Sequence, residues 1–134
     1  MTNIPTASNC STRDFARVTA ILHTYFEGLH QGDVSKLSAV FHDDAWLKSP
    51  NSRRSLAQWL TDVAARSTPV QLNQPFAYKI LSLDIVQDQA MAKIHCPLFD
   101  FNYIDFIGLL KEQGQWRIVT KMYADIKEKN ECKP

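Results

Sequence analysis

Cysteine is scarce in this chain, and its cysteines are not paired in sequence. Cys10, Cys96 and Cys132 are an odd number and form no Cys-x-x-Cys motif. This pattern predicts neither a disulfide framework nor a zinc site. We expect Cys96 to behave as a small buried hydrophobic residue.

Long hydrophobic runs and a charge excess are also missing. No apolar run approaches the roughly 20 residues that a membrane helix needs, and residues 1–11 lack the hydrophobic region of a signal peptide. We therefore expect a cytoplasmic protein with no membrane partner. Fifteen basic and 14 acidic residues give a net charge of +1, so no positive excess indicates a nucleic-acid partner.

Motifs that would identify a cofactor or a metal centre are absent. The chain has no Gly-rich phosphate loop and no Gly-x-Ser-x-Gly motif, which excludes two common classes of active site. The four histidines, His23, His30, His42 and His95, form no His-x-x-x-His pair. We expect no cofactor and no metal.

The residues that are present predict one globular domain that begins with helices. Of the 134 residues, 45% are hydrophobic, which is typical of a folded core. Ser11 and Asp14 have capping-box spacing and predict a helix over 12–31, which Gly32 can end. Asp33 and Ser55 are good N-caps for two further helices. We expect residues 1–11 to be disordered or extended, the domain to span 12–126, and 127–134 to form a charged tail.

The composition of the second half of the chain predicts strands. Runs rich in β-branched and aromatic residues predict strands at about 76–86, 90–98, 103–111 and 116–124, with a shorter one at 45–48. Helices followed by a meander of long strands indicate an α+β fold with an antiparallel sheet.

The last two predicted strands form a hairpin with two apolar faces. Alternation places one set of residues on an inner face: Tyr103, Asp105, Ile107, Leu109, Val119, Lys121 and Tyr123. The opposite set is also apolar: Ile104, Phe106, Leu110, Trp116, Ile118 and Met122. A sheet with two apolar faces must be covered on both sides. We expect helices on the inner face and a second copy of the chain on the outer face.

Four segments carry a resemblance to a known superfamily. They are Tyr25-Phe26-Glu27-Gly28-Leu29-His30-Gln31-Gly32-Asp33, Phe41-His42-Asp43-Asp44-Ala45, Tyr103-Ile104-Asp105-Phe106 and Gly114-Gln115-Trp116-Arg117-Ile118-Val119-Thr120-Lys121. In order and spacing, the chain resembles the nuclear transport factor 2-like superfamily. It is most similar to the lumazine-binding-like and polyketide-cyclase-like branches, many of whose members have no assigned function, and more distantly to ketosteroid isomerase.

The resemblance implies a cone-shaped, cystatin-like α+β fold. N-terminal helices would pack in the concave face of a curved, mainly antiparallel sheet, around an interior pocket, and the convex sheet face would form a homodimer. Tyr25 and Asp105 match the oxyanion-hole pair of the isomerase. The isomerase base falls near Ser49, which cannot carry out that role, so we expect steroid isomerisation to be absent or very slow. An ammonium at Lys121 is expected to keep Asp105 ionised.

The leading functional prediction is an interior, mostly apolar pocket that binds a small organic molecule. Its predicted polar and aromatic contacts are Tyr25, Trp46, His95, Asp105, Lys121 and Tyr123. One alternative is an isomerase, dehydratase or cyclase in which Tyr25 polarises a carbonyl and Asp105 or His95 moves the proton. Another is a dimeric association module without activity. Asp105 and Lys121 could equally form a structural ion pair that holds the sheet register.

Overall fold

The computed structural model describes the backbone of residues 4–127 and the side chains from residue 12 onward. Within this range the chain forms three helices and six strands. In chain order these are α1 (Ile4–Gln31), α2 (Val34–Val40), β1 (Phe41–Ser49), β2 (Ser52–Ser55), α3 (Leu56–Ala65), β3 (Lys79–Val86), β4 (Gln89–Leu98), β5 (Phe101–Glu112) and β6 (Gln115–Asp125).

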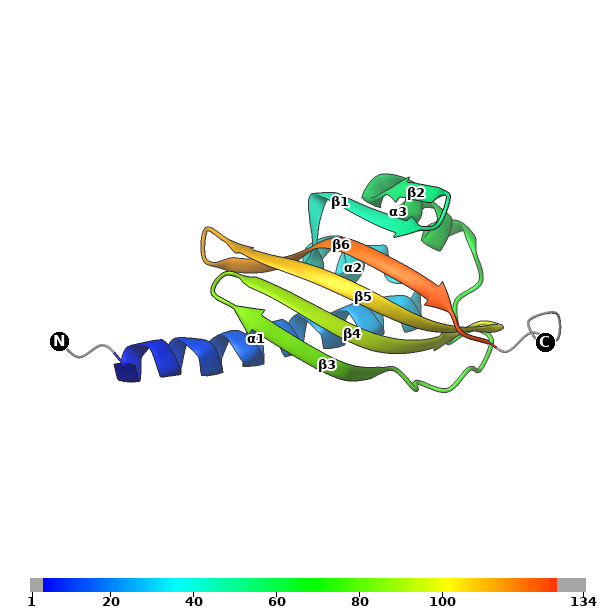
Figure 1. Ribbon diagram of the computed structural model, residues 1–134. Helices are drawn as coiled ribbons and strands as arrows, with labels where there is room; N and C mark the ends of the chain where they lie inside the picture. Colours follow the sequence, from blue (N-terminus) through cyan, green and yellow to red (C-terminus); the bar gives the residue numbers. More distant parts are fainter. Residues whose placement is uncertain (1–3, 128–134) are drawn as a thin grey trace, which may run out of the picture.

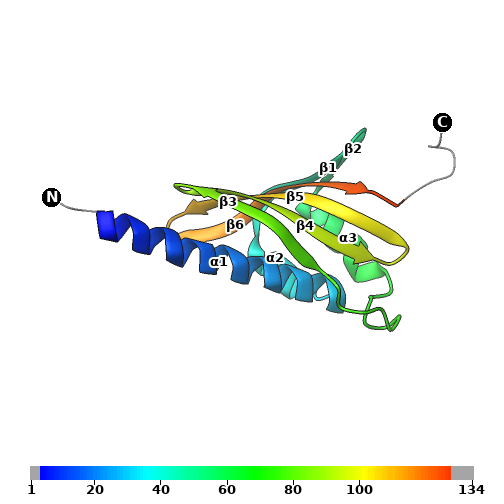
Figure 2. The same ribbon diagram turned by 60° about the horizontal axis from the view of Figure 1, so that its bottom comes forward.

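The strands form one curved sheet that is covered by helices on one face. The strand order is β2-β1-β6-β5-β4-β3, and every neighbouring pair is antiparallel except β1 with β6. Helix α1 runs along the same side of the sheet as α2 and α3 (Figures 1 and 2). The predicted α+β class, with helices against a mainly antiparallel sheet, is therefore confirmed.

Helix α1 starts earlier than the sequence pattern indicated. It begins at Ile4, so residues 4–11 are helical and not disordered or extended as we expected. Pro5 does not prevent this, because proline is tolerated in the first turn of a helix. The first turns of α1 extend past the sheet (Figures 1 and 2). The predicted tail at 128–134, with Cys132, lies outside the described residues, as does the side chain of Cys10.

The caps that were predicted for the later helices are present. Gly32 ends α1 with a φ of +62°, in the left-handed region that glycine tolerates. The side chain of Asp33 accepts a hydrogen bond from the Lys36 backbone N–H at the start of α2. Ser55 and Gln58 form a complete capping box at the start of α3. These local signals place the two short helices correctly.

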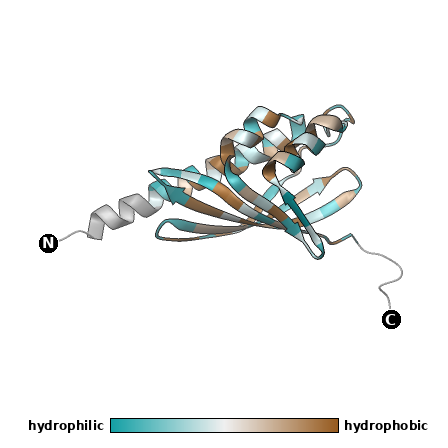
Figure 3. Ribbon diagram, turned by 90° about the horizontal axis from the view of Figure 1, so that it is seen from above, coloured by the Kyte–Doolittle hydropathy of each residue, from teal (hydrophilic) through white to brown (hydrophobic). Residues whose placement is uncertain are grey.

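Hydrophobic residues of α1 face the sheet and form the core. Val18, Leu22, Tyr25, Phe26 and Leu29 are all buried and follow helical spacing. Hydrophobic and hydrophilic residues alternate along the strands (Figure 3), which gives the sheet an inner and an outer face. Cys96 is buried with the core residues, as predicted.

A bulge in β6 changes the predicted faces of the hairpin. Gly108 lies opposite Thr120 and Leu109 lies opposite Ile118, so the pairing skips Val119. An extra residue in one strand reverses the alternation beyond it. Trp116 and Ile118 are consequently buried in the core. Their predicted place on the outer face was wrong.

Asp14, which the sequence suggested as part of a helix cap, instead links α1 to the hairpin. Trp116 Nε1 and Lys111 Nζ each donate to Asp14 Oδ1 over 3.1 Å. Burial alone would raise the pKa of Asp14, but these hydrogen bonds and the positive charge of Lys111 outweigh it and lower the pKa.

We expect Asp14→Asn to lower the free energy of unfolding at pH 7 by about 1–3 kcal/mol, since it weakens two hydrogen bonds to a buried carboxylate. A lowered pKa contributes stability above the unfolded-state value of about 3.9 and loses it as the pH falls through the folded-state value. The difference between wild type and variant, measured by urea unfolding, should therefore shrink below about pH 4. The exposed control Asp84→Asn should have the same free energy of unfolding as wild type. If the loss in Asp14→Asn persisted below about pH 4, the stabilising role of the Asp14 carboxylate would be contradicted.

Candidate functional site

Three polar residues of the cone interior come from the two strands of the hairpin. The inner residues of β5 include Asp105, and after the bulge the inner residues of β6 include Lys121 and Tyr123. Asp105 lies opposite Tyr123, and Lys121 lies opposite Ile107, so the acid and the base are diagonal neighbours across the two strands. Both side chains are buried. The predicted inner-face placement of Asp105 and Lys121 is therefore confirmed.

The Lys121 ammonium has a loose ionic contact and an aromatic enclosure. Its Nζ lies 3.9 Å from Asp105 Oδ2. It also lies 4.8 Å from the ring centroid of Trp59, 5.5 Å from that of Tyr25 and 5.6 Å from that of Tyr123. Such distances suit cation–π attraction, yet no hydrogen bond to Nζ is present within residues 12–127. The three donors of the ammonium are thus available to another group.

Burial shifts both members of this pair toward their neutral forms. It raises the pKa of Asp105, and the positive charge of Lys121 only partly opposes this. It lowers the pKa of Lys121, and the negative charge of Asp105 only partly opposes that. Desolvation outweighs the attraction across 3.9 Å in setting the direction of the Asp105 pKa shift. The expectation that Lys121 keeps Asp105 ionised stays a prediction.

Three buried polar atoms near this pair have no hydrogen-bond partner. They are Tyr25 Oη on α1, Asp105 Oδ1 on β5 and Nη2 of Arg66, which caps the C-terminus of α3. Burial, with a contribution from Asp105, raises the pKa of Tyr25 well above its usual value. The hydroxyl therefore stays protonated and can donate.

Two arginines contribute further positive charge. Arg66 lies 4.9 Å from the ring centroid of Phe99 and forms no salt bridge within residues 12–127. Arg54, on β2, donates to Asp62 over 3.1 Å and to the Tyr123 hydroxyl over 3.3 Å. Both arginines are partly exposed, in contrast to Lys121.

These side chains enclose a small cavity of about 40 Å³. Its lining consists of Leu29, Arg54, Trp59, Arg66, Leu98, Tyr103, Lys121 and Tyr123. Given roughly 30 Å³ per water molecule in the liquid, it has room for a group of one or two waters. The lining holds three cationic side chains and no carboxylate, so the prediction of a mostly apolar pocket was wrong.

The structure brings together four of the six predicted pocket residues and separates two. Tyr25, Asp105, Lys121 and Tyr123 converge on the interior. Trp46 is 44% exposed between the buried Ala45 and Leu47, so it belongs to the outer face.

His95 also lies on the outer face. It alternates with the buried Ile94 and Cys96 along β4, and its Nε2 is hydrogen-bonded to Asn102 Oδ1. Because His95 faces away from Asp105 and Tyr25, it cannot act as a proton carrier at the interior cavity.

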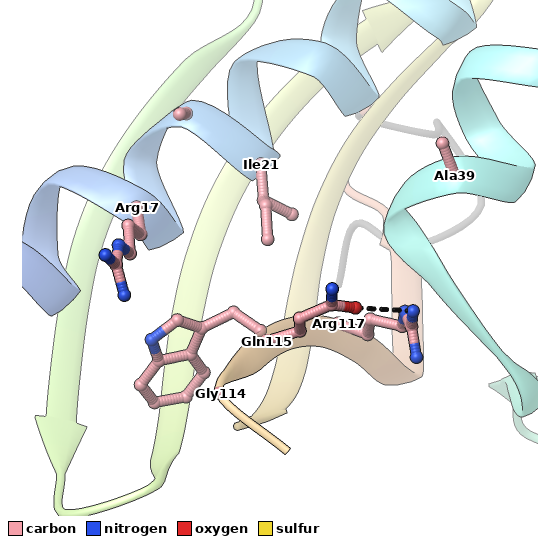
Figure 4. A pocket seen from close by; sticks show the side chains of 8 residues that line it. Arg17, Ile21, Ala39, Gly114, Gln115 and Arg117 are labelled. Atoms are coloured by element: carbon pink, nitrogen blue, oxygen red, sulfur yellow. Dashed lines mark hydrogen bonds between the residues drawn. The ribbon is translucent and has the colours of Figure 1, made fainter. Parts of the chain in front are cut away.

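A larger hollow of about 410 Å³ lies outside the cone, between α1, α2 and the turn of the β5–β6 hairpin (Figure 4). Arg17 and Arg117 flank it, and Arg117 Nη2 donates to Gln115 Oε1 over 2.6 Å. Most of its lining residues are exposed. In the described part of the chain, none of the buried polar atoms without a partner belongs to this lining. The polar atoms without a partner therefore lie away from the outer hollow, and one of them, Nη2 of Arg66, belongs to a residue that lines the smaller interior cavity.

No group of three or more His, Cys, Asp or Glu side chains within the described residues could hold a metal ion. No helix in the described range is long and apolar enough to span a bilayer.

The fold is that of the nuclear transport factor 2-like proteins. A protein of unknown function from Shewanella baltica superposes with a TM-score of 0.76 at 22% identity, over 87% of this chain and 97% of that chain. A protein of unknown function from Silicibacter pomeroyi superposes with a TM-score of 0.70 at 21% identity, over 86% of this chain and 98% of that chain. A protein with a cystatin-like fold from Novosphingobium aromaticivorans superposes with a TM-score of 0.73 at 12% identity, over 94% of this chain and 90% of that chain.

The sequence also identifies the family. The family model described as putative lumazine-binding matches residues 13–124. The chain therefore belongs to the putative lumazine-binding family. A search of curated proteins found no match.

Proposed function

We propose that the interior of the cone binds a small organic molecule. The observation that supports this is the convergence of three buried polar atoms without partners, Tyr25 Oη, Asp105 Oδ1 and Arg66 Nη2. Each such atom costs about 1–3 kcal/mol when left unsatisfied, and native proteins contain few of them. A ligand that forms hydrogen bonds with these atoms would remove this cost.

Native mass spectrometry of freshly purified protein tests the proposal. We expect an adduct of constant mass, one per subunit, that disappears under denaturing conditions. Leu98→Phe adds volume to the wall of the interior cavity and should abolish the adduct. The control Ala39→Phe adds volume to the outer hollow and should leave the adduct intact. An adduct lost only in Ala39→Phe, or no retained molecule in any spectrum, would contradict the proposal.

A second candidate function is an isomerase, dehydratase or cyclase that polarises a carbonyl. Burial raises the pKa of Tyr25 well above its usual value, so its hydroxyl stays protonated and could donate to a developing oxyanion. His95 is excluded as the proton carrier by its position on the outer face. Ser49, near the position of the isomerase base, offers no carboxylate.

We also propose a homodimer through the outer face of the sheet. Phe106 and Met122 lie directly opposite each other on β5 and β6, and each is 45% exposed. Met91 and Trp46, on the flanking strands, are exposed to a similar extent. Exposed apolar side chains on the same face of four neighbouring strands are typical of an interface. An association module without activity would use this same surface.

A further inference from the structure

We infer that the interior ligand is a small organic carboxylate, whose acid group lies between Lys121 and Arg66 and whose flat apolar body lies at the aromatic mouth. This inference rests on the proposed function and names its ligand class. Charge, cavity size and the arrangement of the aromatic rings each support it.

The charge of the cavity lining favours an anionic ligand. Three cationic groups line the cavity, and no lining residue is acidic. Arg54 is neutralised by Asp62 at 3.1 Å, and Lys121 is only loosely paired with Asp105 at 3.9 Å. Arg66 forms no salt bridge within residues 12–127. Lys121 is buried and only loosely paired, and Arg66 is half-buried without a counter-ion in that range, so an anion bound here would be favoured over a neutral group of the same shape.

The donors define the kind of anion. Arg66 offers Nη2, which is buried and has no partner, and Lys121 offers an ammonium without hydrogen bonds. Two such donors match the two oxygens of a carboxylate. The cavity of about 40 Å³ has room for a group of that size.

The exposure of the lining residues shows where the rest of the ligand would lie. Lys121 and Trp59 are buried, whereas Tyr103 and Tyr123 are partly exposed, so the tyrosines lie toward solvent. Their rings are perpendicular, with centroids 5.8 Å apart. Phe101 stacks on Tyr103 at 5.1 Å. These rings provide a surface on which a flat apolar body can pack.

Calorimetric titration with benzoate and with benzamide tests the inference. The two probes have the same shape, but only benzoate is charged. We expect benzoate to bind at least about tenfold more tightly than benzamide, since a charge-assisted hydrogen bond contributes more than the 1.4 kcal/mol that corresponds to a factor of ten. Arg66→Gln should reduce benzoate affinity by about tenfold or more for the same reason, and Arg66→Lys should restore part of it.

Arg117→Gln is the matched control, because it removes an arginine from the outer hollow. It should leave benzoate affinity unchanged. A loss in Arg117→Gln with no loss in Arg66→Gln would place the anion outside the cone and overturn the inference. Arg66 is partly exposed, so its variants should fold, and circular dichroism checks this.

The outcomes separate the inference from the proposed function. Equal binding of benzoate and benzamide, both lost in Leu98→Phe, would keep an interior ligand site and overturn the carboxylate. No binding of benzoate up to 10 mM would also overturn the carboxylate, whatever adduct native mass spectrometry finds. A neutral compound recovered from the purified protein would do the same.

Discussion

Replacing Asp105 with leucine should lower the free energy of unfolding by about 3–5 kcal/mol, because the Lys121 ammonium then remains buried without a counter-ion. Lys121→Met should cost a similar amount by leaving the carboxylate alone. Urea or thermal unfolding at pH 7 measures both. These are the largest stability effects that we expect from single substitutions in the interior.

The loss in Asp105→Leu should depend on pH. Burial lowers the folded-state pKa of Lys121, so the folded protein releases that proton before the unfolded chain does. Stability therefore rises with pH between the folded-state value and the unfolded-state value of about 10.4. The deficit of Asp105→Leu relative to wild type should shrink as the pH is raised toward 10.

The double variant completes a thermodynamic double-mutant cycle for Asp105 and Lys121. Asp105→Leu with Lys121→Met removes both charges together, and much of the single-variant loss should be recovered. The ion pair between Asp100 and Lys127 is a control, since its atoms are 2.9 Å apart but both side chains are exposed. Its coupling should be about 1 kcal/mol or less. Additive effects at Asp105 and Lys121 would show that they do not act as a pair.

The coupling energy and the retention of ligand together show whether Asp105 and Lys121 are structural or bind the ligand. Strong coupling with unchanged ligand binding would mean that the pair is structural and holds the sheet register. Weak coupling, small single effects and lost binding would assign Asp105 and Lys121 to the ligand.

Met122→Glu should convert the dimer that we propose into a monomer. The carboxylate would be buried without a partner at the centre of the outer face, which should weaken association by about 100-fold or more. Phe106→Glu, directly across the strand pair, should have the same effect. Analytical ultracentrifugation at micromolar concentration should show twice the 15.3 kDa chain mass for wild type and the single mass for each variant.

Val86→Glu is the control for this experiment. Val86 is the most exposed of the large hydrophobic side chains in the described part, at 71%, but it lies at the end of the edge strand β3. Its substitution should leave the dimer intact. A monomeric wild type, or a dimer that survives both Met122→Glu and Phe106→Glu, would contradict the assignment of the outer face.

Local signals predicted most of the fold. Asp33, Gly32 and Ser55 act through residues one to four positions away, so their caps could be identified from sequence. The strands from 76 onward were predicted to within a few residues because their composition is distinctive. The parallel pairing of β1 with β6 could not be foreseen in the same way, since it joins segments that are distant in the chain.

The candidate site was predicted only in part. Alternation correctly placed Asp105, Lys121 and Tyr123 on one face, and the helical pattern placed Tyr25 in the core. Arg54 and Arg66 were missed, because a short strand and a helix end give no periodicity that shows which way a long side chain turns.

The order of helices and strands, the caps and the polar character of one hairpin face are properties of neighbouring residues, and the amino-acid sequence by itself determined them. Tertiary structure decided which side chains meet. The bulge at Val119 turned Trp116 and Ile118 inward, and the packing of α3 against β1 placed Arg66 in the same cavity lining as Lys121. These outcomes depend on contacts between distant segments, where packing and desolvation outweigh local preference.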